Sequence, residues 1–131
     1  MNTPHVRTVG DRVAEDLRAA VEVLRRDGWA RGQLHDAATG SHDTTGAIFV
    51  GTGYHQQQDD GRWLAQTDTS AGRRASDAIR WAVHCLPVRV LYDWDENACE
   101  NVDQAVEALE NAAVSAERAL RDSRAVERLL S

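Results

Sequence analysis

Residues 101–121 read NVDQAVEALENAAVSAERALR, and this stretch decides the fold. Apolar residues recur in it every three or four positions, a spacing that places them on one face of an α-helix. That face consists of Val106, Leu109, Ala113, Ala116 and Leu120. Asn101 stands directly before the pattern and is a residue type that caps helices. We therefore predict a long helix from Val102 to about Arg121, with the apolar face turned toward a core.

Two segments upstream carry the same periodicity. A first helix is predicted from Asp11 to about Asp27, and Gly28 follows it as a stop signal. Another is predicted from Ser70 to Leu86. Pro87 then ends this helix and opens a short one that runs through Leu91.

The middle of the chain supports two interpretations. Thr44 or Thr45 can cap a helix through AIFVGTGYHQQ, residues 47–57, but residues 48–50 with the glycines that follow fit a short strand equally well. Residues 56–70 are polar and contain the turn signal Asp-Asp-Gly, so we predict a loop there.

The strong elements are all helical. We therefore predict an all-α fold, a small single-domain bundle of about four helices, with room for a minor β-hairpin near residues 31–50. One domain accounts for residues 1–131, since this length is typical of a single core. Residues 1–9 are predicted to be a flexible arm, and residues 122–131 a tail with little to pack on.

The charge pattern excludes several kinds of chemistry. All 15 basic residues are arginine, which rules out a lysine Schiff base, a P-loop lysine and a lysine general base. The formal net charge of -6 argues against direct binding of nucleic acid through phosphate contacts. It favours a protein partner with a basic surface.

The chain also lacks the signals of a secreted or membrane protein. Its two cysteines lie in different segments and form no disulfide framework. There is no apolar run of membrane length and no signal-peptide core near the first residue. We predict a cytoplasmic protein with reduced thiols and no membrane contact.

The acidic residues are concentrated in one segment. Residues 93–110 read DWDENACENVDQAVEALE and hold seven acids and no base, so the rest of the chain carries a net charge of +1. Aromatic residues stand at the start of this segment, and such residues are enriched at interface anchors. The predicted partner-binding residues are Tyr92, Asp93, Trp94, Asp95, Glu96, Glu100 and Glu107. The alternatives are a solvated helix face for the acids and a core position for Trp94.

Two metal motifs are incomplete. Asp93, Asp95 and Asn97 match the first three ligand positions of a calcium-binding EF-hand loop, but the glycine at position six and the glutamate at position twelve are missing. His35, His42 and Asp43 could converge with His84 or Cys85, yet no zinc-type spacing is present. We predict neither a metal nor a cofactor.

Several of these motifs together resemble a known family. They are DGW at residues 27–29 followed by RGQL, GAI at residues 46–48, LYDW at residues 91–94, and the helix VDQAVEALENAA. This pattern, over roughly residues 11–115, is similar to an uncharacterised family of small actinobacterial and actinophage proteins that share a domain of unknown function. The chain departs from the family pattern at Asp95-Glu96-Asn97, which is longer and more acidic, and at His42-Asp43, where a cysteine is common. The resemblance implies a bacterial or phage protein that acts in the host cytoplasm.

From these observations we predict a protein without enzymatic activity. Its role would be that of a protein-interaction or regulatory module, such as a phage protein that binds a host protein through the acidic and aromatic surface. One alternative is a metal-dependent hydrolytic enzyme that uses His35, His42 and Asp43 together with the carboxylates of Asp93 and Asp95. Another is a self-assembling structural protein, a homo-oligomer in which Arg73, Arg74 and Arg80 of one copy dock on the acidic segment of the next.

Overall fold

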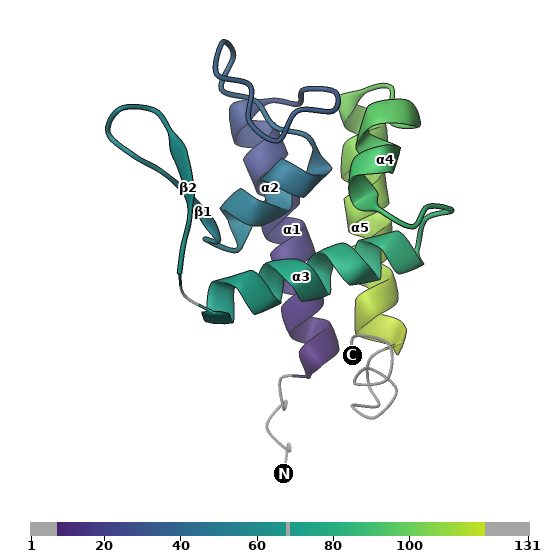
Figure 1. Ribbon diagram of the computed structural model, residues 1–131. Helices are drawn as coiled ribbons and strands as arrows, with labels where there is room; N and C mark the ends of the chain where they lie inside the picture. The colour runs from purple at the N-terminus through teal and green to yellow at the C-terminus, as the bar shows by residue number, and fades with distance from the viewer. Residues whose placement is uncertain (1–7, 68, 120–131) are drawn as a thin grey trace.

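Two long helices, α1 (Val9–Asp27) and α5 (Val102–Ala119), pack against each other along the core of the protein. A computed structural model describes residues 8–67 and 69–119, and within these ranges the fold is mostly helical, as predicted. Helix α3 (Thr69–His84) crosses both long helices, while α2 (Thr44–Gly51) and α4 (Leu91–Asn97) lie beyond it toward the end of the molecule opposite the two termini (Figure 1).

Helix α1 begins two residues earlier than its apolar pattern predicted. Thr8 and Asp11 form a capping box, in which each side chain accepts a hydrogen bond from the backbone N–H of the other. Thr8 and Val9, which were predicted to belong to a flexible arm, therefore form the start of this helix, and residues 1–7 lie outside the described residues, as does the predicted tail. The helix stops at Gly28, whose φ of 94° favours glycine.

Small side chains let α5 approach its neighbours closely. Its buried face consists of Ala105, Leu109, Ala112, Ala113 and Ala116, so the predicted stripe is largely confirmed, with Val106 half-buried and Leu120 outside the described residues. The indole N–H of Trp81, on α3, donates a hydrogen bond of 2.9 Å to the backbone oxygen of Ala112. This bond satisfies the one polar atom of a large buried side chain.

The segment left open by the sequence is helical. Helix α2 covers Thr44–Gly51 and is capped by Asp43, not by Thr44 or Thr45, because the Asp43 carboxylate accepts the Gly46 N–H at 2.8 Å. A side chain at Gly46 would clash with the backbone, since an added Cβ would lie 1.9 Å from the backbone oxygen of Leu34.

A small β-hairpin is present, but its predicted position was wrong. Strands β1 (His55–Gln57) and β2 (Trp63–Ala65) pair antiparallel, and all but His55 lie in the stretch of residues 56–70 that was predicted to be a loop. Residues 31–43 instead form turns and irregular backbone, closed by a single bridge between Trp29 and His42. The strands are only three residues long, HQQ and WLA, so they carry no alternating apolar pattern.

The first part of the acidic segment is helical. Residues 91–97, LYDWDEN, form helix α4, and its first residue stands where the predicted short helix was expected to end. No side chain caps α4 at Val90. The helix is fixed instead by the side chains that it buries, which are Leu91, Trp94 and Asp95. In the described parts of the chain, no helix is long and apolar enough to cross a membrane.

The close approach at Gly46 gives a first prediction. Gly46→Ala should lower the free energy of unfolding by about 3 kcal/mol or more, because the methyl group has no space beside Leu34. Urea unfolding followed by circular dichroism measures this change. The matched control is Gly72→Ala in α3, where the Cβ would lie 3.4 Å from the Tyr54 ring and the stability should stay equal or rise by up to about 1 kcal/mol. Equal losses in both variants would contradict the prediction.

Candidate functional site

Asp95, predicted to bind a partner, is fully buried and holds the start of α2. Its Oδ1 accepts the Thr44 N–H at 3.1 Å and also the Thr44 hydroxyl. Its Oδ2 accepts the Thr45 N–H at 3.1 Å and the Thr45 hydroxyl at 2.7 Å. These donors stabilise a carboxylate at the positive end of a helix dipole. The assignment of Asp95 to a binding surface was therefore wrong, because this residue joins α4 to α2 inside the protein.

A second buried carboxylate lies beside the first. Asp43 Oδ1 accepts the Gly46 N–H, whereas Asp43 Oδ2 has no hydrogen-bond partner in the described residues. Burial, followed by the negative charge of Asp95, raises the pKa of Asp43 to about 7. Burial also raises the pKa of Asp95, but its hydrogen bonds from Thr44 and Thr45 oppose that shift. Asp43 is therefore the carboxyl group that carries a proton below neutral pH.

The other predicted binding residues fall into two groups. Trp94 is only 9% exposed and belongs to the core, as one alternative held. Tyr92, which is 40% exposed, donates a hydrogen bond of 3.1 Å from its hydroxyl to the Gly32 backbone oxygen. The backbone oxygen of Glu96 accepts a bond of 2.9 Å from Arg31 Nε. These contacts attach α4 to the loop that follows α1, while the side chains of Asp93 and Glu96 remain exposed.

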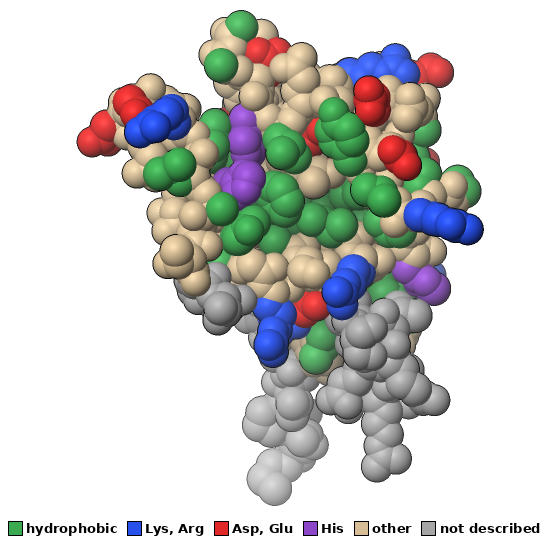
Figure 2. All heavy atoms as spheres, in the orientation of Figure 1, with side chains coloured by type: hydrophobic (Ala, Val, Ile, Leu, Met, Phe, Trp, Pro, Cys, Tyr) green, Lys and Arg blue, Asp and Glu red, His purple; other side chains and the backbone are tan. Residues whose placement is uncertain are grey.

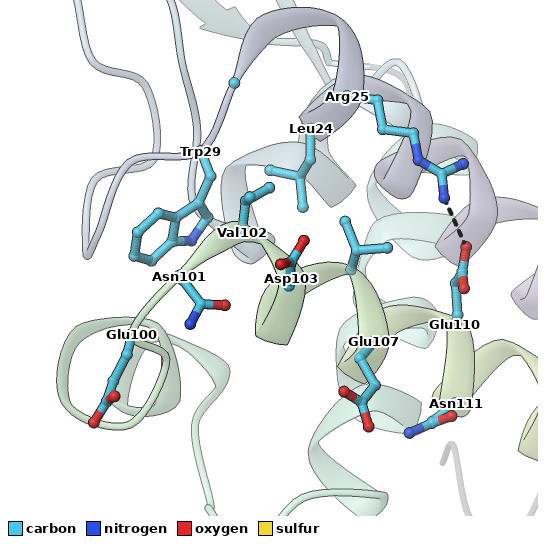
Figure 3. A pocket seen from close by; sticks show the side chains of 12 residues that line it. Leu24, Arg25, Trp29, Glu100, Asn101, Val102, Asp103, Glu107, Glu110 and Asn111 are labelled. Atoms are coloured by element: carbon cyan, nitrogen blue, oxygen red, sulfur yellow. Dashed lines mark hydrogen bonds and ion pairs between the residues drawn. The ribbon is translucent and has the colours of Figure 1, made fainter.

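The remaining two predicted residues, Glu100 and Glu107, line an open groove of about 730 Å³. It lies between the end of α1 and the start of α5, and Figure 3 shows their side chains around it. The apolar lining is made of Leu24, Trp29, Val102 and Val106. The acidic lining is made of Glu100, Asp103, Glu107 and Glu110. We call this feature the acidic groove.

One basic residue contributes to the acidic groove. Arg25 bonds Glu22 at 2.8 Å and Glu110 at 3.3 Å, and it is the only base among the twelve residues that line the groove. Neither Glu100 nor Glu107 has an ion pair in the described part of the chain. The groove is therefore an apolar surface bordered by uncompensated negative charge.

Three histidines meet on the other side of the loop that follows α1. His35 Nδ1 lies 2.9 Å from His42 Nδ1, and His35 Nε2 lies 2.8 Å from His55 Nδ1. His42 Nε2 lies 2.7 Å from Asp27 Oδ2, and Trp63 stacks on His35 with ring centroids 4.5 Å apart. We call Asp27, His42, His35 and His55 the histidine row.

The histidine row differs from the predicted metal cluster. His55 was not included in that prediction, Asp43 lies with Asp95 instead, and His84 packs on Trp81 at the end of α3 farthest from the hairpin (Figure 1). His35 directs its two ring nitrogens at two different neighbours, so the row does not surround one point. Within residues 8–67 and 69–119, no three His, Cys, Asp or Glu side chains are arranged to hold a metal ion.

Two further expectations are corrected by these contacts. The EF-hand residues Asp93, Asp95 and Asn97 lie in helix α4 rather than in a loop, and Asp95 is already bound by α2. Arg74, one of the arginines expected to dock on the acidic segment of a second copy, pairs instead with Asp16 of α1 in two hydrogen bonds. Neither contact could be predicted from the sequence, because Asp95 and Arg74 bind residues that lie at least 50 positions away along the chain.

The thiols do not form a reactive centre. Cys99 is buried and Cys85 is exposed, and both are free. Burial raises the pKa of Cys99 to about 11 and also raises the pKa of Cys85. Both cysteines are therefore protonated at neutral pH and are weak nucleophiles.

Residues 8–115 match the model of a family of unknown function (DUF6197). The chain belongs to this family. The match covers the residues of the acidic groove, the buried aspartates and the histidine row. No curated protein and no solved structure matches the chain.

The buried cap gives a second prediction. Asp95→Ala should lower the free energy of unfolding by about 3 to 5 kcal/mol, because it leaves the N–H and hydroxyl donors of Thr44 and Thr45 unpaired in the core. The control is Asp93→Ala, an exposed acid in the same helix, which should change stability by less than about 1 kcal/mol. Denaturant titrations of both variants measure the free energy of unfolding. A loss for Asp95→Ala as small as that for Asp93→Ala would contradict the prediction.

The proton on Asp43 gives a third prediction. Between pH 3.8 and 7 the folded chain keeps a proton that the unfolded chain releases, so this carboxyl group makes stability fall as the pH rises through that window. Asp43→Asn keeps a capping side chain and removes the titration. The stability of the variant relative to the wild type should therefore rise by about 1 to 3 kcal/mol between pH 5 and pH 8. A difference that is the same at both pH values would show that Asp43 is ionised throughout.

Proposed function

We propose that this protein is an interaction module that binds a basic segment of a partner protein in the acidic groove. The observation that carries the proposal is the combination of an apolar floor with an acidic border, in which Glu100 and Glu107 have no ion-pair partner in the described residues. An apolar side chain of the partner would cover Val102 and Val106, and neighbouring arginine or lysine side chains would meet the acids.

The size of the acidic groove supports a peptide segment as its occupant. A volume of about 730 Å³ is within the range of sites that hold a few side chains or a small ligand. Val102 lines the groove and is 39% exposed, although the residues around it are charged and typical of a solvated helix face. An apolar residue exposed among acidic side chains favours a specific contact over charge attraction alone.

The proposal keeps part of the binding surface predicted from the sequence. Glu100 and Glu107 lie in the groove, and Asp93, Glu96 and Tyr92 are exposed on α4. Asp95 and Trp94 are excluded because they are buried. The acidic residues that the sequence grouped in one segment therefore have three different places. Asp95 is a buried structural carboxylate, Asp93 and Glu96 are exposed on α4, and Glu100 and Glu107 line the groove.

The setting of this interaction is part of the proposal. The resemblance to actinobacterial and actinophage proteins supports a partner in the cytoplasm of a bacterial host, and a phage protein that modulates a host protein fits that setting. The net charge of -6 supports a protein partner over nucleic acid.

The fourth prediction tests the groove with a defined probe. A fluorescent peptide of four arginines around one leucine should bind the wild type, and Glu100→Arg with Glu107→Arg should weaken binding at least about tenfold through loss of attraction and added repulsion. Val102→Ser should also weaken it, without any change in charge. Fluorescence anisotropy at low and moderate salt measures both effects.

The matched control reverses two acids outside the groove, Asp59→Arg with Asp60→Arg in the hairpin turn. This variant has the same net charge as the groove variant, so general electrostatic attraction predicts equal losses for the two. The proposal fails if they bind the peptide equally, or if Val102→Ser binds as well as the wild type. If the peptide results support the proposal, a pull-down from an actinobacterial lysate with the same variants would identify the natural partner.

A further inference from the structure

A second groove, of about 420 Å³, lies between the end of α3 and the start of α4. Its apolar lining is made of Ile79, Val83, Val90 and Leu91. Its remaining lining residues are Arg80, His84 and Arg89, so no acidic residue lines it. Figure 2 shows basic and histidine side chains beside apolar ones at the edge of the molecule where α3 ends. We call this feature the basic groove.

One side of the basic groove belongs to the α3–α4 loop, residues 85–90, which projects from the side of the molecule (Figure 1). Val90 in this loop is 55% exposed, more than any other large apolar side chain in the described residues. The side chain of Arg89 is also exposed, and it makes no hydrogen bond or ion pair within the described parts of the chain. Pro87 restricts the backbone of the loop, so little conformational freedom is lost when the loop is bound.

The α3–α4 loop and the acidic groove are complementary in charge and alike in apolar character. In the groove, Glu100 and Glu107 have no ion pair among the described residues and stand near the exposed Val102. In the loop, an unpaired Arg89 stands next to the exposed Val90. A contact between the two surfaces would give each unpaired charge a partner and would cover both valines. Apolar burial would then supply affinity, and the charges would fix the register.

The two surfaces do not meet within one copy. The acidic groove lies between α1 and α5, the basic groove lies between α3 and α4, and no residue lines both. Self-assembly was also an alternative from the sequence, but with other arginines. Of these, Arg74 is held by Asp16 of its own chain, whereas Arg89 is exposed and unpaired in the described residues. A second copy can therefore supply the base that the acidic groove lacks.

We propose that the acidic groove binds the α3–α4 loop of a second copy of this chain, with Arg89 paired to Glu100 and Glu107 and with Val90 against Val102. This inference rests on the proposed function, because it names a partner for the same groove. The contact joins two different surfaces, so each copy offers one groove and one loop for association.

The net charge of -6 on each copy opposes association over long distances. At physiological salt, charges more than about 8 Å apart are largely screened, whereas charges in contact are screened much less. The pairs between Arg89 and the groove acids then outweigh the repulsion between the rest of the two copies. Physiological salt is therefore the condition under which the contact should form.

Analytical ultracentrifugation at physiological salt tests the contact and gives the fifth prediction. The wild type should associate as its concentration is raised to about 1 mM, a range that detects even a weak contact. Arg89→Glu should raise the dissociation constant at least about tenfold, because it replaces attraction to the groove acids with repulsion. Val90→Ser should also raise it, without any change in charge. Serine is a favourable residue at this position, which is the N-cap of α4, so the fold should be kept.

The matched control is Arg62→Glu in the hairpin turn. The side chain of Arg62 is 73% exposed and lines neither groove, and the variant has the same net charge as Arg89→Glu. Its dissociation constant should stay close to that of the wild type. Equal weakening by the two variants would overturn the proposed contact, since overall charge alone would then explain both.

A mixing experiment identifies the two surfaces that meet. Arg89→Glu keeps the acidic groove intact, and Glu100→Arg with Glu107→Arg keeps the α3–α4 loop intact. Each variant alone should be a monomer at concentrations where the wild type associates. An equimolar mixture should form a 1:1 dimer, because the groove of one variant can bind the loop of the other. A mixture that stays monomeric under these conditions would overturn the pairing of groove and loop.

Peptide binding separates this contact from the proposed function. Arg89→Glu should still bind the peptide of the fourth prediction, because its acidic groove is unchanged, and the peptide should disperse wild-type oligomers by competition. A wild type that binds the peptide but remains a monomer would overturn the second copy as a partner and leave the proposed function in place. A wild type that neither binds the peptide nor associates would overturn both.

Discussion

The fold depends on one carboxylate that joins two helices far apart in the sequence. Asp95 of α4 accepts both backbone N–H groups and both hydroxyls at the start of α2, from Thr44 and Thr45. An ionised group can remain buried because four donors and a helix dipole replace water around it. Each helix is too short to be stable alone, with eight and seven residues, so the contact fixes both.

That contact also sets the chemistry of the residues that precede α2. With Asp95 ionised, its neighbour Asp43 takes up a proton more easily than an ordinary carboxyl group. The backbone N–H of Asp43 donates to the Gln33 oxygen at 2.8 Å, and that of His42 to the Gly28 oxygen at 3.1 Å. The start of α2 therefore holds the preceding loop against the end of α1, which brings His42 to Asp27.

The sequence predicted the secondary structure well where it depends on neighbouring residues. Helices α1, α3 and α5 follow from apolar residues three and four positions apart, and the free cysteines from their spacing. The role of Asp95 could not be predicted, because its partners lie about 50 residues away and its neighbours are exposed acids. The histidine row was missed for a similar reason. His35, His42 and His55 share no spacing that marks a site, and they meet only because a hairpin that carries no apolar alternation folds over the loop.

The acidic groove and the histidine row share a single piece of backbone. Trp29 lines the groove, and its bridge partner His42 belongs to the histidine row. A hydrogen bond of 2.9 Å from the Ala30 N–H to the His42 oxygen closes this bridge. A substitution at Trp29 would therefore disturb both sites and could not separate their functions. Glu107 and His55 each belong to one site and lie on separate elements, α5 and β1. Changes at these two positions act on one site at a time, so the acidic groove and the histidine row can be tested independently.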